Sequence, residues 1–106
     1  TEEGELFNVD GKGNRVAAMI YGPDNVIVIA GRNKIVTDLY EAFSRVRQLA
    51  APANAVRLSR KTPCVETGKC QDCKSKDRIC SSFVVSRFQL VPDRIKVIIV
   101  GEELGY

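Results

Sequence analysis

Residues 25–50 read NVIVIAGRNKIVTDLYEAFSRVRQLA, and this stretch decides the fold. After Asn25, residues 26–30 form a continuous apolar run rich in β-branched side chains, which is typical of a strand covered on both faces. A helix follows, because Asp38 is a candidate N-cap with Glu41 three residues later. The apolar side of that helix consists of Leu39, Phe43, Val46 and Ala50. Strand, loop and helix form a βα unit, so residues 31–34 lie at the carboxyl end of a central strand, where α/β sheets commonly bind ligands.

The flanking segments predict further elements on both sides of this unit. Upstream we expect a strand at residues 5–10 and a short helix at residues 16–21. Downstream we expect two neighbouring strands, residues 83–90 and 94–100, joined by a turn at Pro92-Asp93. The sequence therefore predicts one α/β unit over residues 1–106, with a mixed sheet and flanking helices.

Further details are predicted for the helix that begins after Asp38, which we call the long helix. Pro52 is expected to end it, because proline lacks the N–H that continues the hydrogen-bond ladder. A second short helical piece is expected at residues 53–58. Glu41 and Arg45 are expected to face solvent as a charge pair four residues apart.

All four cysteines of the chain lie in one segment, with the spacing C-x5-C-x2-C-x6-C. They are Cys64, Cys70, Cys73 and Cys80. Two thiolates separated by two residues can reach a single metal ion or cluster from one tight turn. The segment follows a helix and precedes a strand, so we interpret residues 61–81 as a loop inserted into the α/β unit. We call it the cysteine loop.

Four hypotheses compete for these cysteines: two disulfides, a thioredoxin-like pair at Cys70 and Cys73, unrelated thiols, and a metal or iron–sulfur site. No signal peptide is visible, which disfavours disulfides. A redox pair leaves the outer two cysteines unexplained, and clustering disfavours unrelated thiols. The metal hypothesis is favoured, and an iron–sulfur cluster is preferred over zinc because zinc ribbons usually carry two C-x2-C pairs.

The cysteine loop and the residues before it are basic. Residues 57–78 contain seven cations and three anions, a net charge of +4 in a chain whose total is +3. Nearby cations offset the charge of ligating thiolates. A solvated basic loop, or a patch for an acidic partner, explains the same charge equally well.

Two glycine-containing loops are candidate anion or substrate sites. The first comprises Gly11, Gly13, Asn14 and Arg15, and the second Gly31 and Arg32. A glycine turn that opens onto a helix can hold an anion with its free backbone N–H groups. A plain tight turn is the competing interpretation of the first loop.

Composition excludes several functions. The chain has no histidine and no legible nucleophile–base pair, so its catalytic residues are unassigned. A net charge of +3 is small, and no aromatic residue interleaves with the basic loop, so nucleic-acid binding is not expected. No apolar run approaches the ~20 residues of a membrane span. We therefore expect a soluble, cytoplasmic protein.

Several motifs together resemble a known family. They are Gly11-Lys12-Gly13-Asn14-Arg15-Val16-Ala17-Ala18, Tyr21-Gly22-Pro23, Gly31-Arg32-Asn33-Lys34, Ala51-Pro52-Ala53-Asn54-Ala55, Lys61-Thr62-Pro63-Cys64, Gly68-Lys69-Cys70 and Asp72-Cys73-Lys74. This set is similar to the LUD-domain family of lactate-utilisation proteins, and to a subgroup that carries a cysteine loop. The similarity covers nearly the whole chain and corresponds to the C-terminal half of such a protein.

The resemblance implies a fold similar to the NagB/RpiA/CoA-transferase superfamily. It also implies a link to the oxidation of L-lactate to pyruvate beside iron–sulfur partner subunits. Much of the family lacks the four-cysteine loop, so the resemblance does not itself assign a cluster. Half of such a sheet would expose an edge, so a homodimer is a further expectation.

Overall fold

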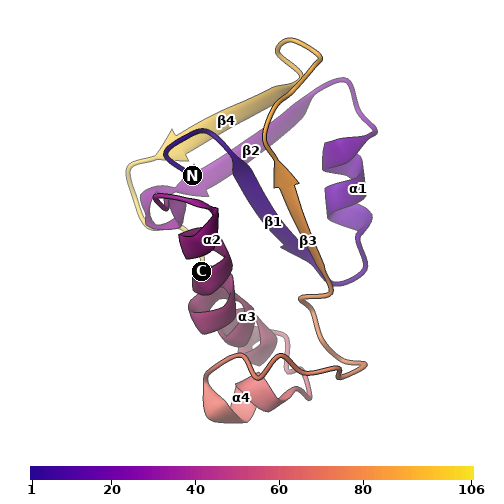
Figure 1. Ribbon diagram of the computed structural model, residues 1–106, viewed down its shortest axis with the longest axis vertical. Helices are drawn as coiled ribbons and strands as arrows, with labels where there is room; N and C mark the ends of the chain where they lie inside the picture. Colours follow the sequence, from indigo (N-terminus) through magenta and orange to yellow (C-terminus); the bar gives the residue numbers. More distant parts are fainter.

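The computed structural model describes residues 1–106 and contains two small sheets surrounded by helices (Figure 1). The elements in chain order are β1 (Leu6–Asp10), α1 (Asn14–Ile20), β2 (Val26–Gly31), the 3₁₀ turn η1 (Arg32–Lys34), α2 (Leu39–Arg45), the π-helical turn η2 (Val46–Ala50), α3 (Ala51–Arg57), α4 (Pro63–Thr67), β3 (Ser82–Ser86) and β4 (Ile95–Val100). The predicted α/β class with flanking helices is confirmed.

The four strands form two separate pairs. β1 pairs with β3 in antiparallel register, with Phe7 opposite Val85. β2 pairs with β4 in parallel register, with Val28 opposite Val97. The prediction that the last two strands are neighbours is therefore wrong. The predicted turn at Pro92-Asp93 does form, with the Arg94 N–H donating to the Val91 carbonyl at 3.4 Å, but the segment around it carries the chain from one pair to the other (Figure 1).

β2 is less covered than its sequence predicts. Ile27 and Ile29 are 62% and 63% exposed, while the alternate side chains of the strand are half-buried. The prediction that β2 is a central strand is wrong, because β4 is its only strand neighbour. The prediction that both of its faces are covered is also wrong, because Ile27 and Ile29 are exposed. A β-branched run indicates strand propensity, but it does not specify what covers each face.

The long helix begins where the sequence predicts and ends later. The Asp38 carboxylate caps it by accepting the backbone N–H of Glu41 at 2.8 Å. α2, η2 and α3 then follow one another with helical backbone angles at both junctions. Pro52 therefore does not end the helix, and that prediction is wrong. It lies in the first turn of α3, directly after a turn with wider, five-residue hydrogen bonds, where its missing N–H is tolerated.

The predicted pair between Glu41 and Arg45 does not form. Glu41 accepts hydrogen bonds from the backbone N–H and the hydroxyl of Thr37, which together lower the pKa of its carboxyl group, the hydroxyl bond most strongly. Arg45 donates through Nε to the carbonyl of Asn33 at 3.1 Å. Each side chain satisfies the backbone near the start of the helix.

A membrane-crossing helix needs about 20 apolar residues, and no helix here has both that length and that apolarity.

The core lies where the long helix and α1 pack beside the strands. Its buried apolar residues are Val16, Met19, Val36, Ala42, Val46, Ala51 and Ala55. Phe7 of β1, Phe43 of α2 and Phe83 of β3 form an aromatic cluster with ring centroids 5.0 to 6.3 Å apart. Such edge-on and tilted ring pairs are favourable. This cluster fixes the long helix against the β1–β3 pair.

Arg94 joins α1 to the β2–β4 pair. Its side chain is buried, and its guanidinium donates to the carbonyls of Met19, Ala18 and Pro23 at 2.8, 3.2 and 3.0 Å. The last carbonyls of a helix have no partner within the helix, so a cation there satisfies them and favours the helix dipole. The start of β4 is thereby attached to the carboxyl end of α1.

Candidate metal centre

The cysteine loop begins with a short helix that presents Cys64. Pro63 occupies the first position of α4, where its missing N–H costs no hydrogen bond. Gly68 ends the helix with φ +71°, a left-handed conformation that favours glycine, and its N–H donates to the Cys64 carbonyl at 3.0 Å. The chain therefore turns at Gly68, two residues before Cys70.

A proline in the long helix provides the attachment for Cys70. In η2 the N–H of Ala51 bonds the carbonyl of Val46, five residues earlier. The next bond of this kind would join Pro52 to the carbonyl of Arg47, but proline has no N–H. That carbonyl accepts the backbone N–H of Cys70 at 3.2 Å instead. The proline thus frees the acceptor that holds the loop against the helix.

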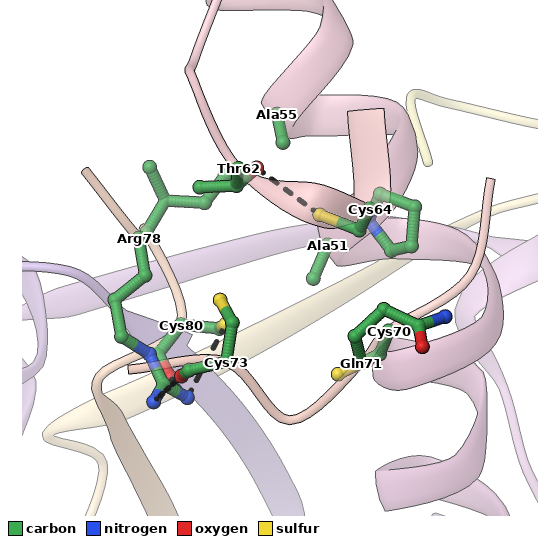
Figure 2. Close-up of a pocket in the computed structure, with 11 residues that line it drawn as sticks. Ala51, Ala55, Thr62, Cys64, Cys70, Gln71, Cys73, Arg78 and Cys80 are labelled. Carbon is green, nitrogen blue, oxygen red and sulfur yellow. Dashed lines mark hydrogen bonds between the residues drawn. The ribbon is translucent and has the colours of Figure 1, made fainter. Parts of the chain in front are cut away.

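All four cysteines line one cavity of about 20 Å³ between the loop and α3. Ala51, Ala55, Thr62 and Ile79 contribute to its wall. Figure 2 shows the four sulfurs around this space, with Cys64 on one side, Cys73 and Cys80 near Arg78, and Cys70 beside Gln71. Each cysteine is half-buried, and none forms a disulfide. The structure therefore brings the four predicted ligands to one place.

Three of the sulfurs contact polar groups of the chain. The Cys64 sulfur lies 3.2 Å from the Thr62 hydroxyl, and the Cys70 sulfur accepts the backbone N–H of Asp72 at 3.4 Å. The Cys80 sulfur accepts from Arg78 Nη2 at 3.6 Å. Hydrogen bonds of this kind stabilise a thiolate and tune the metal that it binds.

Arg78 is the residue most closely tied to the cavity. Its guanidinium donates to the carbonyls of Cys73 and Cys80, the latter at 2.8 Å, and the bond to the Cys80 sulfur raises the pKa of Arg78 above its ordinary value. Its Nε atom is buried and has no acceptor in the chain. A buried N–H without a partner costs about 1–3 kcal/mol, so an acceptor in the cavity would stabilise this arrangement.

A second arginine faces the thiols from the helix. The Cys70 side chain, through a hydrogen bond and then through its charge, raises the pKa of Arg47. Arg47 therefore holds Cys70 by its carbonyl, which accepts the Cys70 N–H at 3.2 Å, and its positive charge lies near the thiol. The sequence analysis missed this residue, because a proline in an ordinary α-helix frees the carbonyl four residues earlier, and only the π-turn moves the freed carbonyl to Arg47.

The chemistry of the four cysteines fits a four-thiolate centre, but their side chains do not converge on a single ion in this conformation. No three side chains among the cysteines and carboxylates stand close enough together to share an ion in this conformation. Ligation would therefore require side-chain rotation into the cavity that the sulfurs already border. The chemistry of the donor set, four thiols and no histidine, suits zinc or an iron–sulfur cluster.

The comparison with protein families gives one result. A family model described as LUD domain matches residues 1–100. The chain belongs to the LUD domain family. No curated protein and no solved structure matches it.

In this LUD domain the first glycine loop is occupied by the chain itself. The carboxylate of Asp10 accepts the backbone N–H groups of Lys12, Gly13, Arg15 and Val16 at 3.0 to 3.3 Å. These bonds, that of Gly13 first, lower the pKa of Asp10. Asn14 begins α1, and the Arg15 guanidinium donates to Asn8 and to the carbonyl of Val9. The anion site predicted at Gly11, Gly13, Asn14 and Arg15 would require a ligand that displaces Asp10.

The second glycine loop lies under the carboxyl-terminal segment of the LUD domain. The backbone N–H of Arg32 donates to the carbonyl of Glu102 at 3.0 Å, and Asn33 bonds the backbone of Leu104 and Gly105. A side chain at Gly31 would come within 2.6 Å of this segment. The substrate site predicted at Gly31 and Arg32 remains a prediction, and here the chain's own tail covers the loop.

Asp77 anchors the far end of the cysteine loop. Its carboxylate accepts the backbone N–H of Lys61 and pairs with Arg60 at 3.1 Å. The Lys61 bond, followed by Arg60, lowers the pKa of Asp77. The sequence shows Asp77 as one acid in a basic segment, and only the fold reveals that it closes the loop.

Proposed function

We propose that this LUD domain protein is a lactate-utilisation-type subunit whose cysteine loop binds an iron–sulfur cluster through Cys64, Cys70, Cys73 and Cys80. The observation that carries the proposal is that all four thiols line one cavity together with Arg78, whose buried Nε has no acceptor in the chain. Thiolates accept hydrogen bonds in either kind of site, and the sulfides of a cluster would add further acceptors that a zinc ion lacks.

The chain's own residues perform three tasks in this proposal. Arg47 and Arg78 balance the negative charge of the thiolates from two sides. Asp77 joins the two ends of the loop through Lys61, and the Arg47 carbonyl holds its middle at Cys70. Ala51 and Ala55 keep one wall apolar. When bound, the cluster would supply one-electron exchange, with a potential set by these charges and hydrogen bonds.

The link to L-lactate rests on membership of the family. We propose that the protein serves the oxidation of L-lactate to pyruvate together with iron–sulfur partner subunits, and that it forms a homodimer. Free thiols that bind a cluster require a reducing compartment, which supports a cytoplasmic location.

A structural zinc module that docks a protein partner is the second candidate. The observation that favours it is the size of the cavity, because about 20 Å³ holds roughly one water-sized sphere. A single ion fits such a space once the cysteine side chains rotate toward it, whereas a cluster also requires the loop to open.

Metal analysis of anaerobically purified protein separates the two candidates. The cluster predicts iron with a matching amount of acid-labile sulfide and broad visible absorption. One equivalent of zinc without sulfide would replace the cluster by the zinc module. Four titratable thiols with no metal would reject both.

The lactate link needs a separate test on the native complex. A tagged copy of this chain is purified with its bound subunits and supplied with L-lactate and a one-electron dye. Dye reduction that a Cys70→Ser chain fails to support is expected. A complex that reduces the dye equally with either chain would exclude a role for the cysteine loop in lactate oxidation.

A further inference from the structure

Cys70 also borders a second, open groove of about 560 Å³. One wall is a single face of the long helix, and the other is the turn Gly68–Cys70. The helical wall consists of Tyr40, Phe43, Ser44, Arg47 and Gln48, which recur at the three- and four-residue spacing of one helix face. This volume lies within the range of small-molecule sites.

The groove is cationic and has unused donors. Its eight lining residues include Arg47 and Lys69 but no aspartate or glutamate. All four ion pairs of the chain involve arginines, which leaves Lys69 without a carboxylate partner. An anion in the groove would therefore meet a lysine that no internal acid neutralises.

The groove also offers flat apolar surface. The side chain of Tyr40 is 85% exposed, and Phe43 lies one helical turn further along. The Arg47 guanidinium stacks over the Phe43 ring, 5.5 Å from its centroid. A guanidinium held this way keeps in-plane N–H groups that suit the oxygens of a phosphate.

We propose that this groove binds a mononucleotide, a ligand that joins a planar aromatic ring to a phosphate group. The ring would stack on the exposed Tyr40 beside Phe43, whose own ring already packs on Phe83 and under Arg47, and the phosphate would lie between Lys69 and Arg47. The site does not require a filled metal centre, because the hydrogen bond from the Cys70 N–H to the Arg47 carbonyl already joins the two walls. Binding alone is proposed, and no bond is made or broken.

Flavin mononucleotide is a suitable probe, because stacking on a tyrosine quenches flavin fluorescence. The expected result is saturable quenching with a Kd in the micromolar range, about −8 kcal/mol, and at least roughly tenfold weaker binding of riboflavin, which lacks the phosphate. Inorganic phosphate should compete weakly. Riboflavin binding as tight as the nucleotide, or no saturation below about 1 mM, would overturn the proposal.

Two variants with the same charge change sharpen the test. Lys69→Glu should weaken nucleotide binding by at least about tenfold. Lys76→Glu changes another exposed lysine of the cysteine loop, outside the groove, and should change Kd by less than roughly twofold. Equal losses in both variants would mean general charge attraction and reject the site.

A third variant keeps the test independent of charge. Tyr40→Ala should weaken binding, while Tyr40→Phe should keep the affinity, measured by calorimetry, and lose most of the quenching, because a phenyl ring stacks but does not donate an electron to the excited flavin. Unchanged binding in Tyr40→Ala would reject the stacked ring. Iron and sulfide content is measured on the same samples, so the metal proposal and the nucleotide proposal fail separately.

Discussion

The first glycine loop, residues 11–15, and the cysteine loop, residues 61–81, both have the sequence pattern of a ligand site. The structure separates them by what their polar groups contact. In the glycine loop one carboxylate, that of Asp10, already accepts the N–H groups that would hold an anion. In the cysteine loop four thiols and Arg78 surround a cavity, and the buried Nε of Arg78 has no acceptor in the chain. Unsatisfied groups that converge indicate a ligand better than a motif does.

The glycine loop and the cysteine loop also differ in how their charges are balanced. The anion of the glycine loop is built into the chain, so the loop is electrostatically complete when folded. In the cysteine loop the arginines are supplied by the chain, and the thiols that face them can be joined by a metal. We therefore expect changes in the cysteine loop to alter metal content and stability together, and changes in the glycine loop to alter stability alone.

The largest effect is expected from Cys70→Ser. A lost thiolate ligand should weaken metal retention by roughly 100-fold or more, which linkage converts to about 2.7 kcal/mol of the free energy of unfolding of the loaded protein. Chelator competition and urea denaturation under reducing, anaerobic conditions measure both quantities. Ser81→Ala, an exposed change beside Cys80, is the control and should change neither. Equal stability of Cys70→Ser and wild type would remove the structural role of the ligand.

The next effect is expected from Arg78→Met. This change removes the donors to the carbonyls of Cys73 and Cys80 and should cost about 2 kcal/mol in urea denaturation. Arg78→Lys keeps the positive charge but loses the planar set of guanidinium N–H donors. It should therefore keep the charge balance of wild type without its full stability. If the lysine variant matched wild type in both stability and metal retention, the hydrogen bonds of Arg78 would be irrelevant and only its charge would count.

Asp10→Asn tests the glycine loop and should have a smaller effect, without loss of metal. Because folding lowers the pKa of Asp10 below its ordinary 3.8, its contribution to stability is present above that pH and is lost as pH falls through the lowered value. The variant should therefore be less stable than wild type at pH 7 and approach it near pH 3. Urea midpoints at both pH values measure this. A stability difference that persists at low pH would show that the carboxylate charge is not what organises the loop.

The smallest effect is expected from Pro52→Ala. Alanine restores an N–H that can compete with Cys70 for the Arg47 carbonyl, while it also increases the entropy of the unfolded chain. The net change should be below about 1 kcal/mol, with faster hydrogen exchange at the Cys70 amide as its specific sign. Unchanged exchange at that amide would mean that the proline does not control the attachment of the loop.

The sequence predicts local structure better than it predicts neighbours. The Asp38 cap and the start of the long helix follow from side-chain chemistry within four residues, and both are confirmed. The partner of β2 depends on contacts some 70 residues apart, which periodicity does not contain, so its exposed face was missed. Pro52 was misread because a π-turn upstream of it changes which carbonyl needs a donor.

The same contrast between local features and distant contacts holds for the candidate site. The spacing of the cysteines was sufficient to group them, and the structure places all four on one cavity. The contributions of Arg47 and Asp77 come from tertiary contacts across 16 or more residues. The glycine pattern alone does not distinguish an anion site from a plain turn, and only the structure shows that Asp10, directly before the loop, accepts its N–H groups.

Native mass spectrometry of the anaerobic protein tests the central claim most directly. The account predicts one bound metal or cluster mass per chain, present in wild type and in Asp10→Asn, and lost in single serine substitutions of Cys64, Cys70, Cys73 and Cys80. A chain that carries no added mass under these conditions, or a mass that survives the four substitutions, would contradict it.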